Sequence, residues 1–342
     1  MNNDNRSLTK LIKLMKVETS QATTLDELLN VVTKAIHYDG EIRYRRGTFY
    51  TVMILLFAAF ASGVIIIYLG RALPPYSLLI YFVLLILTVI VLGEVFCQEN
   101  SIDSLSSDLF FKSLKIANGI EDHVLKPGEV HDLGTTFSEF QRGNYSRHFA
   151  QEWRVKSSEQ SRPALYYRFH YVDQYTRVVS EPDGKGGVRT RTVTEFTHYD
   201  RYGLVFDFPY ALGLSINSSG KTLNPVSYKP AYSEFCERFT IGANSELEAA
   251  KFLKPALVEQ VVNLSHYFTR LNIQISNQGQ MLIAFSEPML SECKQQYSLR
   301  EPQLFYQELQ QNSVIENLKA ANELLDVFTH YLDNNFQEEP QL

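Results

Sequence analysis

The stretch FYTVMILLFAAFASGVIIIYL, from Phe49 to Leu69, carries no charge, and a second apolar run, LLIYFVLLILTVIVLGEV, follows from Leu78 to Val95. A helix rises about 1.5 Å per residue, so about 20 apolar residues cross the hydrocarbon core of a bilayer, which is roughly 30 Å thick. Between the runs, Pro74 and Pro75 predict a turn, because proline cannot continue a helix. The pattern therefore predicts a transmembrane helical hairpin over residues 48–97.

Charge around the two runs predicts an orientation. Arg43, Arg45 and Arg46 lie directly before the first run, whereas the link between the runs contains only Arg71. Positive residues stay on the cytoplasmic side of a membrane. We therefore expect a multi-pass membrane protein with both termini cytoplasmic and the lipid bilayer as a partner.

Two small residues in the first run indicate a packing face. Ala59 and Gly63 are four residues apart, so they share one face of a helix. Small residues allow two membrane helices to approach closely. This face is predicted to pack on the second run or on another copy of the chain, which would make the protein a homo-oligomer.

Composition narrows the classes of function. The chain has 342 residues and a net charge of -6, and residues 98–342 carry 23 lysines and arginines against 31 aspartates and glutamates. An acidic C-terminal part argues against nucleic acid as a partner. The three cysteines, Cys97, Cys236 and Cys293, form no CxxC pair, so neither a structural zinc site nor a disulfide framework is indicated. No cofactor is expected.

The region before the apolar runs, residues 1–47, is predicted to be helical. Residues 7–17 form a basic amphipathic pattern, and such a helix can lie on an anionic membrane surface or dock on the protein itself. Thr24 and Glu27 have the spacing of a capping box and predict a helix start. After the hairpin, residues 98–120 are predicted to form a helical stalk that ends at the Asn-Gly pair at 118–119.

Residues 121–342 are predicted to form a cytoplasmic domain of mixed β-sheet and amphipathic helices, which gives an α+β fold class. Alternation of apolar and polar residues predicts strands in the β-rich part, at about 165–171, 188–199 and 202–208. Helices are predicted at 245–253, 255–267 and 313–331, and a β-hairpin at 271–275 and 281–285.

Three blocks of sequence carry a family resemblance. They are the strand Tyr202-Gly-Leu-Val-Phe-Asp-Phe208, then Gly220-Lys-Thr222 with Pro225 after it, and then Phe235-Cys-Glu-Arg-Phe239 leading to Leu253-Lys-Pro-Ala-Leu-Val-Glu-Gln-Val261. The order resembles domain-of-unknown-function family 3137, over about residues 199–286. The segment Glu246-Leu-Glu-Ala-Ala-Lys251 departs from the acidic-plus-arginine signature expected there. The resemblance implies a bacterial inner-membrane protein with two transmembrane helices and a cytoplasmic α+β domain, and it implies no activity.

A basic and aromatic set of residues on the predicted strands is the candidate binding surface. Arginine and tyrosine suit contacts with lipid phosphates or with a protein, and they are also ordinary residues for the exposed face of a strand. The predicted set is Arg168, Arg177, Arg189, Arg191, Tyr166 and Tyr171. The leading hypothesis is a membrane-anchored, non-enzymatic binding or scaffold protein that presents this surface to a protein or lipid partner.

Two alternatives remain open. His170 and His198 lie on neighbouring predicted strands, with Asp200 nearby, and are the candidate pair for a metal site in a metal-dependent hydrolase. The polar tail at 337–340 suggests a secreted bacterial effector that inserts into a host membrane. No catalytic motif with a serine or cysteine nucleophile occurs, so whether the chain is an enzyme stays open, with binding favoured.

Overall fold

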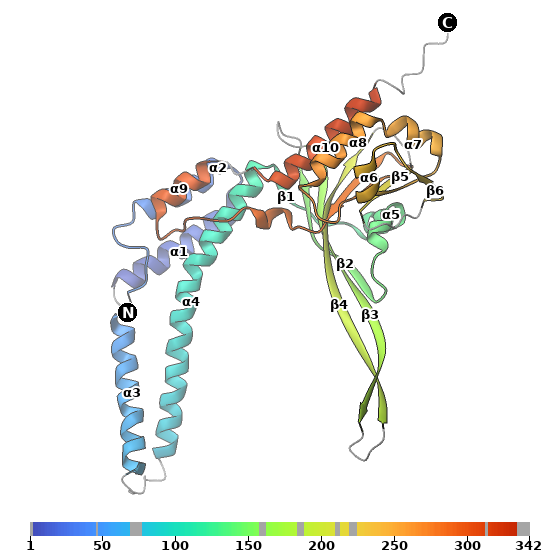
Figure 1. Cartoon of the computed structure of the whole chain (residues 1–342). Coiled ribbons are helices and arrows are strands. Elements are labelled where there is room, and N and C mark those ends of the chain that lie inside the picture. The colour runs from blue at the N-terminus through green and yellow to red at the C-terminus, as the bar shows by residue number, and fades with distance from the viewer. Residues whose placement is uncertain are drawn as a thin grey trace. The chain divides into compact units, whose positions relative to one another are not determined.

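The computed structural model of the chain describes residues 3–45, 47–68, 77–156, 162–182, 188–208, 213–218, 224–311 and 314–333. The chain falls into two compact units (Figure 1). Unit 1 comprises Met1–Ala117 and Lys294–Ser313, and unit 2 comprises Asn118–Cys293 and Val314–Leu342. The predicted boundaries differ from this division, because the segment Lys294–Ser313 belongs with the N-terminal helices.

Unit 1 is helical in the part of the chain that is described. Its helices are α1 (Asn3–Gln21), α2 (Leu25–Ile36), α3 (Gly47–Tyr68), α4 (Ser77–Ala117) and α9 (Pro302–Gln310). The predicted capping box is confirmed: Glu27 N–H donates to Thr24 Oγ1, and Thr24 N–H donates to the Glu27 carboxylate. Two reciprocal hydrogen bonds therefore stabilise the start of α2, and both come from backbone N–H groups that have no partner within the helix.

The basic amphipathic helix docks on the protein itself. α1 is longer than predicted, and its side chains Leu8, Ile12 and Met15 are buried. Lys112 Nζ, on α4, donates to the carbonyl of Thr19 at 2.6 Å, near the end of α1. The apolar face of α1 that carries these side chains thus belongs to the core of unit 1, whereas Leu14 and Val17 are exposed beside the polar residues.

The prediction of a membrane location is wrong. A membrane-spanning helix needs about 20 consecutive apolar residues, and no helix within the described residues is long and apolar enough to cross a membrane. The apolar run Leu78–Val95 is only the first part of one 41-residue helix, α4, whose sequence continues through Glu99 and Asp103. Neither the transmembrane hairpin over 48–97 nor a multi-pass inner-membrane protein with cytoplasmic termini is supported. The link at 69–76 lies outside the described residues.

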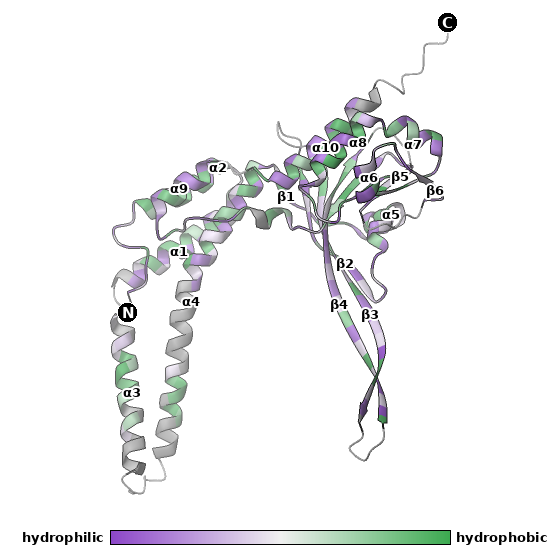
Figure 2. Cartoon of the chain, in the orientation of Figure 1, coloured by the Kyte–Doolittle hydropathy of each residue, from purple (hydrophilic) through white to green (hydrophobic). Residues whose placement is uncertain are grey.

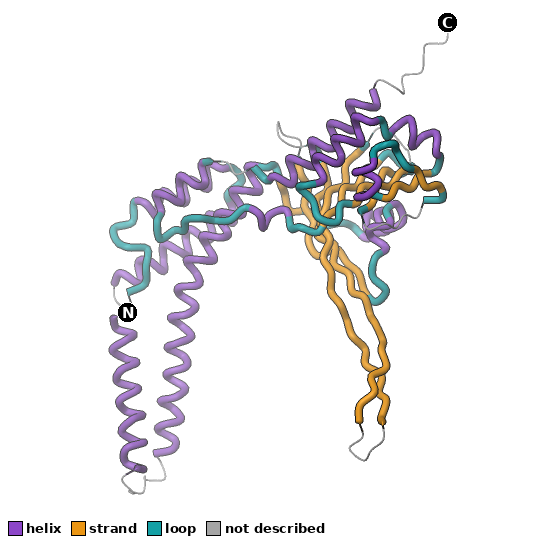
Figure 3. The backbone as a smooth tube through the Cα atoms, in the orientation of Figure 1, coloured by secondary structure: helices purple, strands orange, loops and turns teal. Residues whose placement is uncertain are grey.

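Unit 2 is built on one antiparallel sheet, which has nine strands among the described residues, in the order β1-β2-β3-β4-β9-β8-β5-β7-β6 (Figure 3). The strands are β1 (Ile120–Asp122), β2 (Ser146–Val155), β3 (Ala164–Pro182), β4 (Val188–Asp207), β5 (Leu214–Asn217), β6 (Val226–Tyr228), β7 (Thr240–Ala243), β8 (Asn272–Ile275) and β9 (Gln280–Phe285). The α+β class is confirmed. The sheet is not mixed as predicted, because all of its strand pairs within the described residues are antiparallel.

Helices cover the centre of this sheet. They are α5 (Pro127–Thr136), the 3₁₀ turn η1 (Ser138–Gln141), α6 (Ser233–Arg238), α7 (Glu246–Phe252), α8 (Pro255–Ser265), the 3₁₀ turn η2 (Met289–Glu292) and α10 (Glu316–Asp333). Leu133, Phe137 and Phe140 of α5 and η1 pack with Tyr167 and Phe169 of β3. α8 packs beside α10, and Phe252, just before α8, stacks on Phe328 of α10.

Several predicted elements of unit 2 are confirmed and one is corrected. α7, α8, α10 and the hairpin of β8 and β9 lie where the sequence predicts them. The predicted strands at 188–199 and 202–208 are instead one continuous strand, β4. The charged residues Asp200 and Arg201 do not end the strand, because both side chains have partners: Asp200 pairs with Arg168 of β3, and Arg201 pairs with Glu139 of η1.

The long strands β3 and β4 extend past their neighbours and form an arm (Figure 1). β2 pairs with β3 only as far as Val172, and β9 pairs with β4 only from Tyr202 onward. We define the arm as residues 173–182 of β3 and 188–197 of β4. Hydrophilic and hydrophobic residues intersperse along it (Figure 2), and most of its side chains are exposed. Residues 183–187, between the two strands, lie outside the described residues.

Gly203 gives a direct test of the packing below the arm. A Cβ at Gly203 would lie 2.6 Å from Tyr167 Oη and closer still to the carbonyl oxygen of Ile283. We expect Gly203→Ala to reduce the free energy of unfolding of unit 2 by about 1–3 kcal/mol, as overpacking does. Urea unfolding followed by the fluorescence of Trp153, the one tryptophan in the chain, measures this.

Gly134→Ala is the matched control. Gly134 lies inside α5, and a Cβ there meets no atom within 4 Å. Alanine favours a helix interior over glycine by about 0.5–1 kcal/mol, so this variant should be as stable as the parent or slightly more so. Equal losses in the two variants would contradict the packing described at Gly203.

Candidate functional site

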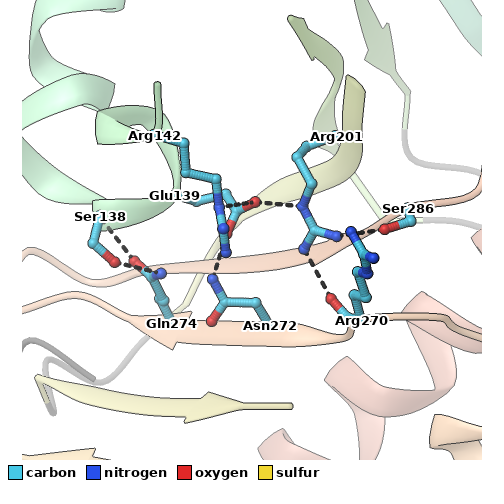
Figure 4. Close-up of polar contacts among 8 residues, drawn as sticks. All are labelled: Ser138, Glu139, Arg142, Arg201, Arg270, Asn272, Gln274 and Ser286. Atoms are coloured by element: carbon cyan, nitrogen blue, oxygen red, sulfur yellow. Dashed lines mark hydrogen bonds and ion pairs between the residues drawn. The ribbon is translucent and has the colours of Figure 1, made fainter. Parts of the chain in front are cut away.

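A buried carboxylate lies where the arm leaves the sheet. The side chain of Glu139, in η1, has no solvent exposure. Arg201 Nε of β4 donates to Glu139 Oε1 at 2.6 Å, and Asn272 Nδ2 of β8 donates to Oε2 at 2.5 Å. Arg142 Nε lies 2.9 Å from Oε1 and makes a second ion pair. Figure 4 shows these residues converging on the carboxylate; we call them, with the partners of Arg201 below, the root network.

Arg201 uses the rest of its guanidinium to hold neighbouring segments. One terminal nitrogen donates to Ser286 Oγ at 2.8 Å, and the other donates to the carbonyl of Arg270 at 2.8 Å (Figure 4). Ser286 follows β9 and Arg270 precedes β8. A single side chain of β4 therefore ties the start of the arm to η1 and to both strands of the adjacent hairpin.

The root network keeps Glu139 ionised. Burial alone raises the pKa of a carboxyl group, but the charges of Arg201 and Arg142 outweigh burial, so the pKa of Glu139 lies below its ordinary value. Loss of one partner of a buried ion pair leaves an uncompensated charge. The network therefore makes the position of the arm root sensitive to each of its members.

A second polar group lies on the opposite face of the strands. Arg168 donates to both carboxylate oxygens of Asp200, at 3.1 and 2.9 Å. His170 Nδ1 is 2.9 Å from Asp200 Oδ1, and His170 Nε2 is 3.2 Å from His198 Nδ1. Burial raises the pKa of Asp200, whereas the bonds from Arg168 and His170 lower it, with a net decrease. These pairs join β3 to β4 across the base of the arm.

The outer edge of β3 is blocked near both ends of the arm. Asn144 Nδ2 donates to the carbonyl of Gln174 at 3.1 Å, and Gln174 N–H donates to Asn144 Oδ1 at 2.7 Å. The side chain of Asn144 thus satisfies the backbone of Gln174 in place of another strand. At the far end, Pro182 has no N–H to donate, so it disfavours further pairing.

The outer edge of β4 is open. Within the described residues, no strand pairs with residues 188–201 on the side where β9 pairs with Tyr202–Asp207. This segment, VRTRTVTEFTHYDR, contains neither proline nor glycine. Valine, threonine, phenylalanine and tyrosine favour extended strands. We call residues 188–201 the open edge of β4.

Cross-strand ion pairs connect β3 and β4 along the arm. Arg177 pairs with Glu195, and Arg191 Nε donates to Glu181 Oε1 at 3.0 Å. The other face of the arm carries exposed apolar side chains instead: Val178 is 69% exposed, Val188 72% and Phe196 47%. The arm therefore has one charged face and one face with an apolar strip.

The strand register divides the predicted binding residues between two faces. Opposite residues of β3 and β4 share a face, and successive residues alternate. Tyr166 and Arg168 lie on one face, and Tyr171 lies on the other face together with Arg177, Arg189 and Arg191. Both tyrosines are buried, Tyr166 beside Trp153 and Tyr171 in the core below η1. Only the arginines of the arm remain exposed as a group.

The other predicted residues have mixed outcomes. His170 and His198 are adjacent, as their strands suggest, but no group of three or more histidine, cysteine, aspartate or glutamate residues in the described part of the chain is arranged to hold a metal ion. Ala59 and Gly63 fall on α3, and their side-chain surroundings lie outside the described residues. The tail at 337–340 also lies outside them.

Sequence reasoning missed Glu139, Arg201 and Asn144. Glu139 and Arg201 are 62 positions apart, and nothing in one sequence couples them. A local signal existed at Glu139, which lies between Phe137 and Phe140 with Arg142 three residues later. A charged residue inside an aromatic cluster indicates a buried and paired group, because an unpaired charge is costly to bury.

Replacing Glu139 tests the root network. In Glu139→Ala, Arg201 stays buried without its carboxylate, and we expect unit 2 to lose about 3–5 kcal/mol of its free energy of unfolding. Urea unfolding followed by Trp153 fluorescence measures the loss. Glu121→Ala is the control, because Glu121 pairs with Lys156 on the surface and should matter little. A comparable loss in both variants would rule out a special role for the buried pair.

Acid provides an independent test. Because the pKa of Glu139 is lowered in the folded chain, its stabilisation is present above the unfolded pKa of about 4.3 and is lost as pH falls toward the folded pKa. We expect the free energy of unfolding of unit 2 to fall below about pH 4.3, and to fall less steeply in Glu139→Gln, which cannot titrate. Identical pH dependence in the two proteins would contradict the lowered pKa.

Comparisons with known proteins add no relative. No protein-family model, no curated protein and no solved structure matches the chain. The resemblance to family 3137 therefore stays a prediction from its three sequence blocks, and the function has to be argued from the arm and its root.

Proposed function

We propose that the chain is a non-enzymatic binding or scaffold protein, and that it binds a protein partner at the open edge of β4. One observation carries the proposal: residues 188–201 of β4 continue past the end of β9 with no strand beside them among the described residues. The unpaired N–H and C=O groups of such an edge are a template for another strand. A partner would bind by adding an extended segment next to β4.

The contrast between the two edges of the arm supports this choice. The β3 edge has Asn144 on the backbone of Gln174 and a proline at position 182. Natural proteins protect exposed strand edges by such means against unwanted pairing. The β4 edge has neither over fourteen residues (188–201), and its residues favour extended structure. This contrast favours a β4 edge that binds another chain over one that only faces solvent.

Rigidity of the arm root also favours binding. The root network holds Arg201, the last residue of the open edge, and the Arg168–Asp200 pair holds the base of the arm from the other face. A docking element placed on a rigid support loses less conformational entropy when a partner binds. The two polar groups thus present β4 in one orientation.

The side chains of the arm favour a protein as the partner. Its arginines alternate with acids, as in the pairs Arg177–Glu195 and Arg191–Glu181, so the charged face is not uniformly basic. A nucleic acid or an anionic surface prefers a uniformly positive face.

Site-specific photo-crosslinking in the producing cell tests the proposal. A photoreactive phenylalanine analogue at Thr192, on the open edge, should give a protein adduct, whereas the same residue at Leu247, an exposed position on α7, should not. Equal adducts at both positions, or none at Thr192, would contradict the proposal.

A lysine placed on either edge makes the test specific to β4. Lysine on an exposed strand is a natural device against pairing. Thr190→Lys on the β4 edge should abolish the adduct at Thr192, and Thr176→Lys on the β3 edge should leave it unchanged. If Thr176→Lys alone abolished the adduct, the partner would bind the β3 edge instead.

A further inference from the structure

We infer that the strand added to β4 comes from a second copy of this chain, so that two arms pair edge to edge around a two-fold axis. This inference rests on the proposed function, because it names the partner of the same open edge. A closed two-fold contact requires an interface that is complementary to itself. The open edge of β4 meets that requirement in one antiparallel register.

The register is centred on Thr192. In it, Thr192 lies opposite Thr192 of the second copy, and any residue pair whose numbers are symmetric about 192 is opposed. Thr190 then faces Thr194, and threonine pairs are favourable between neighbouring strands. Nine residues, 188–196, take part from each copy, and all lie on the open edge.

The apolar strip becomes paired in this register. Val188 faces Phe196 of the second copy, and by symmetry the contact occurs twice. Both residues share one face of β4, and they are 72% and 47% exposed in the single chain. Pairs of an aromatic with a β-branched residue are among the stabilising cross-strand contacts. Val188 thereby obtains an apolar partner, and Phe196, which already packs against Tyr145, obtains a second one.

The charged face is complementary in the same register. Arg189 faces Glu195 of the second copy, again twice by symmetry. Within each arm Glu195 already accepts from Arg177, and Arg189 lies opposite Glu181 in the register of β3 and β4. The new contacts would join the charged rows of the two arms into one network of alternating sign, in which no like charges are opposed.

Neighbouring registers do not achieve this. A two-fold register centred on position 191 places two arginines, Arg191 of each copy, directly opposite, and like charges across strands are destabilising. A register centred on Val193 places Val188 opposite His198 and separates it from Phe196. Only the register centred on Thr192 pairs both the exposed apolar residues and the opposite charges.

Pairing would also stabilise the arm. A single two-stranded hairpin is at best marginally stable in water. Two arms joined through β4 form a four-stranded antiparallel sheet, in the order β3, β4, then β4 and β3 of the second copy. Three or more strands with an apolar face give independent stability.

Engineered disulfides in the full chain test the register. In a variant with Cys97, Cys236 and Cys293 changed to serine, Thr192→Cys should oxidise to a covalent dimer, because directly opposed Cβ atoms lie about 4.5–5.5 Å apart. Thr190→Cys is the control. Its two copies would be offset by about 13 Å along the strands, beyond the roughly 7 Å Cα limit for a disulfide. We expect about tenfold more dimer with Thr192→Cys.

Mixtures of two different variants test which positions are opposed in this register. Thr190→Cys mixed with Thr194→Cys should form a heterodimer, since these positions are opposed. Without added cysteines, Arg189→Glu and Glu195→Arg should each be monomeric alone by sedimentation, and their mixture should form heterodimers because both contacts then join opposite charges, one with its original sign and one with reversed sign. Circular dichroism checks that each variant keeps the fold of the parent.

The outcomes separate the inference from the function on which it rests. Covalent dimer at Thr192 but not at Thr190 supports a second copy in this register. No dimer at Thr192, with a photo-adduct to a different protein, overturns the inference and leaves the strand-edge function standing. Neither a dimer nor an adduct overturns both.

Discussion

The ion pair of Glu139 with Arg201 is the interaction on which the rest of unit 2 depends. Its carboxylate has no contact with solvent, and it is held by two guanidinium groups and an amide. Arg201 directly precedes Tyr202, where the pairing of β4 with β9 begins. The side chain that neutralises Glu139 therefore also holds the base of the arm. A buried charge tolerates no loss of its partner. The buried carboxylate and the end of the open edge are therefore held by the same side chain.

From Arg201 toward the arm, the sheet changes from a part that helices cover to a part that they do not cover. Around Val205 and Leu282 the strands pack below α5 and η1, whereas beyond His198, opposite Val172, only β3 and β4 remain paired. The two free edges are not equivalent. On the β3 edge Asn144 satisfies the backbone of Gln174, whereas β4 has a long segment of strand-forming residues without such a contact. This asymmetry, rather than any catalytic set, is the feature that leads from the structure to a binding function.

The sequence predicted elements whose signals are local. The capping box at Thr24, the helix that begins at Pro255 and the hairpin of β8 and β9 each depend on residues within a few positions. The sequence also placed His170 and His198 on neighbouring strands, because the two strands follow one another in the chain, and the two side chains are in contact. It failed for features that depend on partners distant in sequence: the burial of Tyr166 and Tyr171, the continuity of β4 through Asp200, and the pair formed by Glu139 and Arg201. The apolar runs illustrate a different failure, because hydropathy alone predicted a membrane hairpin where the described residues contain no spanning helix.

Hydrogen exchange of the β4 backbone shows whether the open edge pairs with a second copy of the chain. In an antiparallel pair, alternate N–H groups of β4 point to β3 and the others point away from it. If two arms pair through β4, the outward N–H groups of residues 188–196 should exchange fast in dilute protein and more slowly as the protein concentration rises. The outward N–H groups of β3 in the arm should show no such change. Exchange of the outward β4 groups that is independent of concentration would contradict this pairing.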